Sequence, residues 1–118
     1  MTIYLNVSCL NRPFDDQGQL RIRLESEAVT IILERCDRRE WKQVSSGIAQ
    51  IEVDAISDPG KRARVRLLLP NDKAILNLTQ PVVQRAAALE KIGFKAADAL
   101  HVAAAEQLGA DEIGRAHV

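Results

Sequence analysis

Residues 95–106 read Lys95-Ala-Ala-Asp-Ala-Leu-His-Val-Ala-Ala-Ala-Glu106, an alanine-rich run with Asp98 and His101 in its interior and Glu106 at its end. Apolar side chains recur at helical spacing and predict a helix over 95–108, with one apolar stripe formed by Ala97, Leu100, Ala104 and Leu108. A carboxylate such as Asp98 on so apolar a helix is costly to bury unless it is paired, hydrogen-bonded or bound to a cation. The alternative is that Asp98 is a solvated helix residue or a cap.

Turn and cap residues divide the chain on the N-terminal side of this run. Thr79 is a good N-cap and Pro81 follows it, which predicts a helix that runs to Ile92 and stops at Gly93. Residues 74–78 have the apolar character of a strand. Two further helices are expected at 47–56 and 61–69, and Asp58-Pro59-Gly60 separates them. The expected inner side of the first is Ile48, Ile51, Ala55 and Ile56.

The first third of the chain predicts a strand, a loop, a long helix and a second strand. The strand covers 2–5. The stretch 6–19 is expected to be a loop, because it contains the turn-forming residues Asn11, Pro13, Asp15, Asp16 and Gly18. A helix of about five turns begins at Leu20 and ends near 38–40. Its expected inner face is Leu24, Ala28, Ile31 and Ile32. A short strand over 43–45 follows, with Ser46 as a helix N-cap.

This order alternates strands with helices, which is typical of a parallel sheet covered on both faces. The expected fold class is therefore α/β, a three-layer α/β/α arrangement with a mostly parallel central sheet. Residues 111–113 begin a strand that does not develop further in the sequence pattern. In such sheets a ligand site lies outside the carboxyl ends of the strands.

Composition excludes several classes of protein. The 118 residues suit one domain, and 47% apolar content with 16 basic and 16 acidic residues argues against disorder and against a strongly basic nucleic-acid coat. Cys9 and Cys36 lack metal-ligand spacing, and we expect two reduced thiols in or near the core. The sequence lacks a long apolar run and the order of a signal peptide, so a cytoplasmic domain without a membrane span is expected.

Smaller polar features each have a plain alternative. Arg12, in the turn over 11–16, could contact a substrate phosphate or belong to a simple turn. The run 61–66 carries four basic side chains and could touch an RNA backbone or form a solvated helix face. His101 follows Asp98 by three residues, and a hydrogen-bonded, packed histidine is the expected reading, with a metal ligand as the alternative.

Three segments together resemble the PIN-domain family: Ile3-Tyr-Leu-Asn-Val-Ser8, Ser46-Gly-Ile-Ala-Gln-Ile-Glu52 and Ala97-Asp-Ala-Leu-His-Val-Ala103. This family includes the toxin ribonucleases of bacterial toxin–antitoxin pairs. The resemblance covers residues 1–113, which we take as a PIN-like domain. Residues 114–118 are expected to be an aberrant tail, with the family's C-terminal strand and helix missing or incomplete.

The resemblance implies an acidic site that this chain retains only in part. Glu52 and Asp98 match the family's second and third acids, and Asn6 occupies the place of the first acid as an amide. The fourth acid has no counterpart. The family's carboxylates hold Mg²⁺ or Mn²⁺, so Glu52, Asp98 and Asn6 are the expected catalytic and metal-ligating residues.

These features imply descent from Mg²⁺-dependent ribonucleases, with weak or no activity in this chain. The alternative is a non-catalytic module that binds RNA or a small antitoxin-like protein, and a third possibility is a gene remnant without a selected role. We also expect a homo-oligomer, because an unfinished sheet edge and the C-terminal helices favour contact with another chain.

Overall fold

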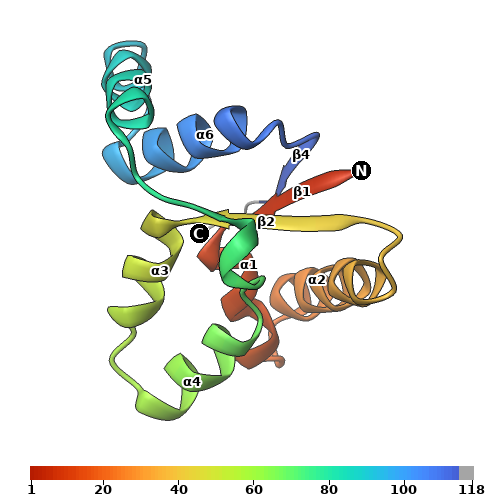
Figure 1. Ribbon diagram of the computed structural model, residues 1–118. Coiled ribbons are helices and arrows are strands. Elements are labelled where there is room, and N and C mark those ends of the chain that lie inside the picture. Colours follow the sequence, from red (N-terminus) through yellow and green to blue (C-terminus); the bar gives the residue numbers. More distant parts are fainter. Residues whose placement is uncertain (115–118) are drawn as a thin grey trace.

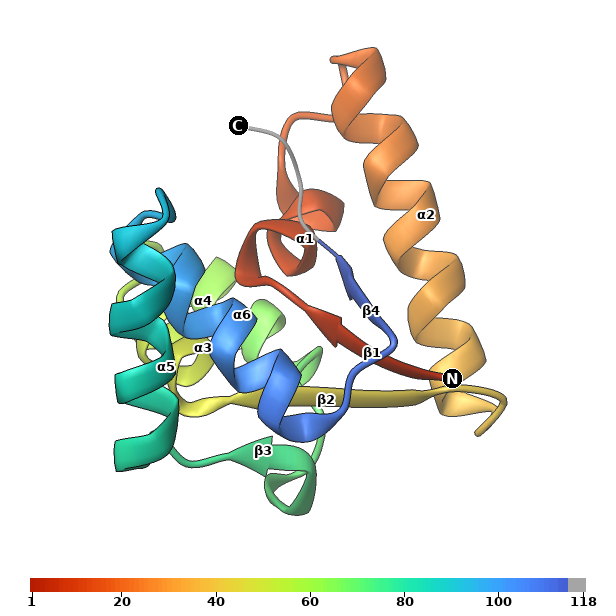
Figure 2. The same cartoon turned by 90° about the horizontal axis from the view of Figure 1, so that it is seen from above.

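The computed structural model describes residues 1–114, and its centre is a four-stranded parallel sheet in the order β3-β2-β1-β4 (Figures 1 and 2). The strands are β1 (Thr2–Leu5), β2 (Lys42–Ser46), β3 (Ile75–Leu76) and β4 (Glu112–Gly114). In the register, Ile3 of β1 lies between Gln43 of β2 and Glu112 of β4. The predicted mostly parallel sheet is confirmed.

Helices cover both faces of this sheet, as Figure 1 shows in a view along its edge. On one side lie α5 (Gln80–Lys91) and α6 (Ala96–Leu108). On the other lie α1 (Val7–Asn11), α2 (Leu20–Asp37), α3 (Gly47–Asp54) and α4 (Pro59–Leu67). Short 3-10 turns cover Arg12–Phe14 and Asp72–Ala74. The three-layer α/β/α arrangement expected from the sequence is therefore confirmed.

The alternation of side chains along β1 produces two hydrophobic clusters, one on each face. Ile3 and Leu5 pack with buried residues of α1 to α4, including Val29 and Val65. Tyr4 points to the other face and packs among residues of α5 and α6, including Val82 and Ala103. A strand buried on both faces is what a parallel α/β sheet requires.

The predicted loop over 6–19 is wrong in its first half, because α1 and a 3-10 turn form there. The side chain of Asn6 accepts the backbone N–H of Ser8 at 3.3 Å and so caps α1, and Pro13 lies at the second position of the 3-10 turn. Asp58-Pro59-Gly60 likewise starts α4, since Asp58 accepts the N–H groups of Gly60 and Lys61. Residues typical of turns act here as helix starts.

Three of the predicted helix faces are also wrong in part. In α2 the buried residues are Ile22 and Val29, while Leu24 and Ile31 are 55% and 52% exposed. In α3 the buried residues are Ala49 and Val53, and Ile51 is exposed. In α6 the buried side chains are Ala99, His101, Ala103, Ala104 and Ala105, and the predicted Ala97 is exposed. Each helix offers two apolar stripes, and only tertiary packing chooses between them.

The C-terminal strand forms further along the chain than the sequence pattern indicates. β4 pairs with β1 over Glu112–Gly114, and the N–H of Asn6 donates to the carbonyl of Gly114 at 2.9 Å. This edge of β1 is therefore covered, and the short β4 is the outer strand on this side of the described sheet. Gly114, which the sequence boundary places in the tail 114–118, belongs to the sheet, whereas the rest of that tail, with His117, lies outside the described residues.

The predictions on the two cysteines and on membrane-spanning helices can be compared with the described part of the chain. Cys9 and Cys36 are both free thiols, the first buried and the second half-buried. Among residues 1–114, no helix has the length and apolar character needed to cross a membrane.

Candidate functional site

The carboxyl ends of β1, β2 and β4 meet at one edge of the sheet. Asn6 follows β1 directly, Ser46 ends β2, and Gly114 ends β4 beside Asn6. Asn6 is buried, and its side-chain oxygen is engaged in the cap of α1. The predicted position of Asn6 at this edge is confirmed, and the sequence did not predict its capping role.

Glu52 lies in α3, the helix that begins where β2 ends. Its side chain is 34% exposed, and its Oε1 contacts the Nε2 of His101, which is almost fully buried in α6. This contact joins α3 on one side of the sheet to α6 on the other (Figure 1). One oxygen of Glu52 is thereby fixed from the inside of the protein.

The other ring nitrogen of His101 continues this contact into the core. Nδ1 lies 2.6 Å from the hydroxyl of Tyr4, and that hydroxyl lies 2.6 Å from the Oγ of Ser46. The rings of Tyr4 and His101 meet edge to face, with centroids 5.6 Å apart. Burial strongly raises the pKa of Tyr4 and outweighs the Ser46 hydrogen bond, which lowers this pKa; the negative charge of Glu52 adds a smaller upward effect. Tyr4 therefore remains a neutral phenol.

Asp98 lies in the first turn of α6 and is half-buried. It precedes His101 by three residues, so both side chains lie on the same side of the helix. Of the three predicted site residues, Glu52 contacts His101 directly, whereas Asp98 and Asn6 are related to these contacts by their positions in the chain. Glu52 binds His101, Asp98 lies one turn from His101, and Asn6 follows Tyr4 by two residues.

The donor set limits which metal site is feasible. Within residues 1–114, no three His, Cys, Asp or Glu side chains are grouped so that they could hold a metal ion. The predicted ligands offer two carboxylates and one amide oxygen, and this amide oxygen already accepts a backbone N–H. Mg²⁺ commonly uses one or two carboxylates and keeps several waters. These oxygen ligands are of the type that binds a hydrated Mg²⁺ or Mn²⁺ weakly. They are too few to surround a cation with protein ligands alone.

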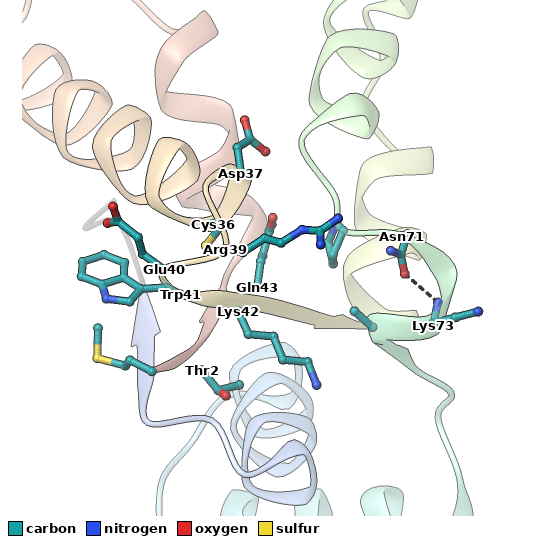
Figure 3. A pocket seen from close by; sticks show the side chains of 13 residues that line it. Thr2, Cys36, Asp37, Arg39, Glu40, Trp41, Lys42, Gln43, Asn71 and Lys73 are labelled. Carbon is teal, nitrogen blue, oxygen red and sulfur yellow. Dashed lines mark hydrogen bonds between the residues drawn. The ribbon is translucent and has the colours of Figure 1, made fainter.

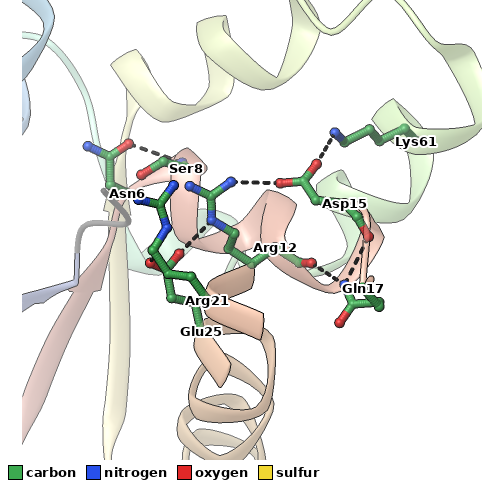
Figure 4. Close-up of polar contacts among 8 residues, drawn as sticks. All are labelled: Asn6, Ser8, Arg12, Asp15, Gln17, Arg21, Glu25 and Lys61. Carbon is green, nitrogen blue, oxygen red and sulfur yellow. Dashed lines mark hydrogen bonds and ion pairs between the residues drawn. The ribbon is translucent and has the colours of Figure 1, made fainter. Parts of the chain in front are cut away.

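Arg12, the predicted phosphate contact, lies in a network of ion pairs (Figure 4). Its Nε binds Glu25 at 2.6 Å, and its Nη1 binds Asp15 at 2.9 Å. Asp15 also binds Lys61 at 2.7 Å, so the network ties the 3-10 turn to α2 and α4. Because two carboxylates occupy the guanidinium, a substrate phosphate would have to compete with them.

The basic run over 61–66 is also engaged in internal contacts. Lys61 pairs with Asp15, and Arg62 donates to the carbonyl of Ile56. Arg64 lies over the ring of Phe14, and Arg66 pairs with Asp54. The run therefore acts in packing as well as at the surface, and it is not a set of four free cations.

A hollow in the described part of the protein lies elsewhere. It measures about 730 Å³ and opens at the amino ends of β1 and β2, the opposite end of the sheet from Asn6 (Figure 3). Its walls carry both signs of charge, with Arg39, Lys42 and Lys73 near Asp37 and Glu40. The hollow therefore lies apart from the candidate site at the carboxyl ends of the strands.

The sequence does not predict the roles of Tyr4 and Ser46 in the contacts that lead to His101 and Glu52. The sequence pattern predicts Tyr4 only as part of a strand and Ser46 only as an N-cap, and the Ser46 side chain makes no capping hydrogen bond. A tyrosine inside a buried strand needs a hydrogen-bond partner for its hydroxyl, and this requirement could have predicted a buried polar contact at Tyr4. The expectation that His101 is packed and hydrogen-bonded is confirmed.

Comparison with known proteins supports the fold. No family model and no curated protein matches the chain. The chain is similar in structure to the crystal structure of FitAcB from Neisseria gonorrhoeae, with a TM-score of 0.60 and 20% sequence identity over 93% of this chain and 84% of that chain. At this identity the likeness shows the fold, which is a three-layer α/β arrangement of the PIN-like kind.

Proposed function

We propose that this domain is a PIN-like, divalent-metal-assisted ribonuclease of low activity, with Glu52, Asp98 and Asn6 as its site. The observation that carries this proposal is the half-exposed carboxylate of Glu52, fixed by His101 beside the carboxyl ends of the strands. Ligand sites of parallel α/β sheets lie at this edge. The resemblance to PIN domains and the structural likeness to FitAcB support the same choice.

The proposed chemistry follows from the residues present. Glu52 and Asp98 would hold Mg²⁺ or Mn²⁺, which activates a water molecule and stabilises charge on the scissile phosphodiester. Asn6 would add a neutral amide oxygen, which brings no negative charge and cannot act as a base. Two negative charges hold a divalent cation less strongly than the four acids of the family pattern, so low metal affinity and slow cleavage are expected.

Cleavage of a mixed RNA pool tests this function. We expect slow cleavage in millimolar Mn²⁺, no cleavage in a chelator, and faster cleavage by Asn6→Asp. Glu52→Gln and Asp98→Asn should each abolish cleavage. Asp54→Asn is the matched control on α3, because Asp54 makes an exposed ion pair with Arg66 and is not one of the proposed site residues.

Two results would contradict the proposal. Cleavage that persists in the Glu52→Gln variant would mean that another site or a contaminant cuts the RNA. Absence of Mn²⁺ binding by calorimetry in both the unaltered chain and Asn6→Asp would exclude a metal site at this edge.

A second candidate function is a module that binds a small antitoxin-like protein. One observation favours it: Leu20, Leu24 and Ile31 of α2 are 59%, 55% and 52% exposed. Their spacing places them within about 40° of one another around the helix, so they form one apolar stripe. Co-purification with the product of a small neighbouring reading frame, lost in Leu24→Lys, would support this candidate.

A further inference from the structure

We propose that Ser46, Tyr4 and His101 form a directed hydrogen-bond relay that positions the carboxylate of Glu52. Its catalytic meaning rests on the proposed function, since Glu52 is the carboxylate that would hold the metal. The relay itself rests on geometry: three side chains with almost no exposure lie in continuous contact and lead to one half-exposed acid.

The direction of the relay follows from the acid at its end. A carboxylate offers only acceptors, so the Nε2 of His101 must carry the hydrogen that faces Glu52. In a neutral imidazole the Nδ1 atom is then an acceptor, and the neutral phenol of Tyr4 donates to it. The single hydrogen of Tyr4 is used there, so Ser46 donates its hydroxyl hydrogen to the Tyr4 oxygen.

The surroundings indicate that this relay serves more than packing. Tyr4 belongs to an apolar cluster with Val44, Val82 and Ala103, where nonpolar side chains would satisfy the packing without hydrogen bonds. The polar groups do not close on one another but end at Glu52, on the surface side. A glutamate on a helix otherwise loses rotamer freedom when it binds a ligand, and prior fixation by His101 removes part of that cost.

The same residues connect to the other two candidate ligands. Asn6 is two residues beyond Tyr4, and Asp98 is one turn before His101. The Tyr4–His101 hydrogen bond therefore holds β1 and the first half of α6 in a fixed relation. Partners that orient metal ligands in this way commonly change metal affinity by 10- to 100-fold when removed.

Nitrogen-15 NMR of labelled histidine tests the relay without any metal. The chain has only two histidines, and a His117→Gln sample assigns the spectrum. We expect the Nε2 of His101 to carry the hydrogen that faces Glu52 in the unaltered protein, with Nδ1 as the acceptor of the Tyr4 hydroxyl. Tyr4→Phe should leave the hydrogen on Nε2, because Glu52 still accepts it, and should shift the Nδ1 resonance to that of an acceptor without a hydrogen-bond donor. Ser45→Ala is the control, since the Ser45 hydroxyl lies outside the relay in the neighbouring position of β2.

Mn²⁺ calorimetry and RNA cleavage then test positioning. Tyr4→Phe and Ser46→Ala should weaken Mn²⁺ binding, by about tenfold for Tyr4→Phe, and lower kcat more than they change KM. His101→Gln, which keeps an N–H donor near the Nε2 position, should retain more Mn²⁺ affinity than His101→Leu. If Tyr4→Phe fails to fold, Ser46→Ala and the His101 pair still decide the outcome.

The outcomes separate this inference from the proposed function. An Nδ1–H tautomer or an imidazolium in the unaltered protein would overturn the assigned direction. Unchanged Mn²⁺ affinity in folded Ser46→Ala, Tyr4→Phe and His101→Leu would overturn positioning. If the unaltered protein and Asn6→Asp bind no Mn²⁺ at all, the proposed function fails, and positioning of a metal-holding carboxylate fails with it, whereas the tautomer result still reports the relay.

Discussion

Ser45 and Ser46 are adjacent hydroxyls in β2 that the fold uses in opposite ways. Both are buried, but among the described residues Ser45 Oγ has no hydrogen-bond partner, whereas Ser46 Oγ lies 2.6 Å from the Tyr4 hydroxyl. Neighbouring positions on a strand point to opposite faces, and this explains the difference.

Alanine substitution should separate the two serines. Ser46→Ala removes a partner from the buried Tyr4–His101 pair, and we expect the free energy of unfolding to fall by about 1–2 kcal/mol. Ser45→Ala removes an unpaired buried hydroxyl, and the free energy of unfolding should stay within about 0.5 kcal/mol or rise. Urea unfolding measures both. Equal losses in the two variants would contradict the hydrogen-bond assignment.

Elements of the fold were more readily predicted than their packing. Periodicity and caps located α2, α5 and α6 closely, because helix propensity and stop signals such as Gly93 and Gly109 are local. The inner face of α2 was not predictable, since Leu24 and Val29 are equally apolar and only the neighbouring layer decides which is buried. The capping role of Asn6 was missed for the same reason that α1 was: a helix so short has no period to detect.

At the level of elements, the Asp15 network predicts a pH dependence of stability. Burial raises the pKa of Asp15, but the hydrogen bonds and charges of Lys61 and Arg12 outweigh burial and hold this pKa below its ordinary value. A depressed folded pKa stabilises the fold above the ordinary value of about 4 and loses that contribution as the pH falls through the folded pKa.

We therefore expect Asp15→Asn to be less stable than the unaltered chain at pH 7, with the gap closing as the pH falls toward 3. Urea unfolding at several pH values measures this gap. Asp54→Asn serves as the control, because its partner Arg66 and Asp54 itself are both exposed, and it should change stability little at any pH. A gap for Asp15→Asn that stays constant down to pH 3 would contradict the prediction.

Across the whole molecule, the sequence could indicate the edge of the sheet where the candidate site is proposed, but not the contacts within it. Asn6, Glu52 and Asp98 come from distant segments: Asn6 follows β1, Asp98 lies in the first turn of α6, and Glu52 lies in the second half of α3, the helix that follows β2. The order of elements predicts that these segments meet at one edge of the sheet. The Tyr4–His101–Glu52 contacts join both layers through the sheet, and no local pattern encodes a contact of that range. The resemblance pointed to the acids, whereas the geometry supplied what fixes one of them.

Self-association is the prediction that belongs to the whole molecule. We expected a homo-oligomer through an open sheet edge or the C-terminal helices, but β4 covers β1, and both outer strands of the described sheet are short. The apolar stripe Leu20, Leu24 and Ile31 instead lies on α2, on the far side of the domain from α5 (Figure 2). A second copy packed there would bury apolar area that water now covers.

Light scattering during gel filtration at tens of micromolar should show a dimer for the unaltered chain and a monomer for Leu24→Lys. Val83→Lys, an exposed position on α5, is the matched control and should remain dimeric. The stripe cannot hold a second copy and another protein at once, so a small partner protein that binds α2 should convert the homodimer into a mixed complex. A clean monomer for the unaltered chain would contradict self-association. A different partner protein would then be the remaining candidate to bind the stripe.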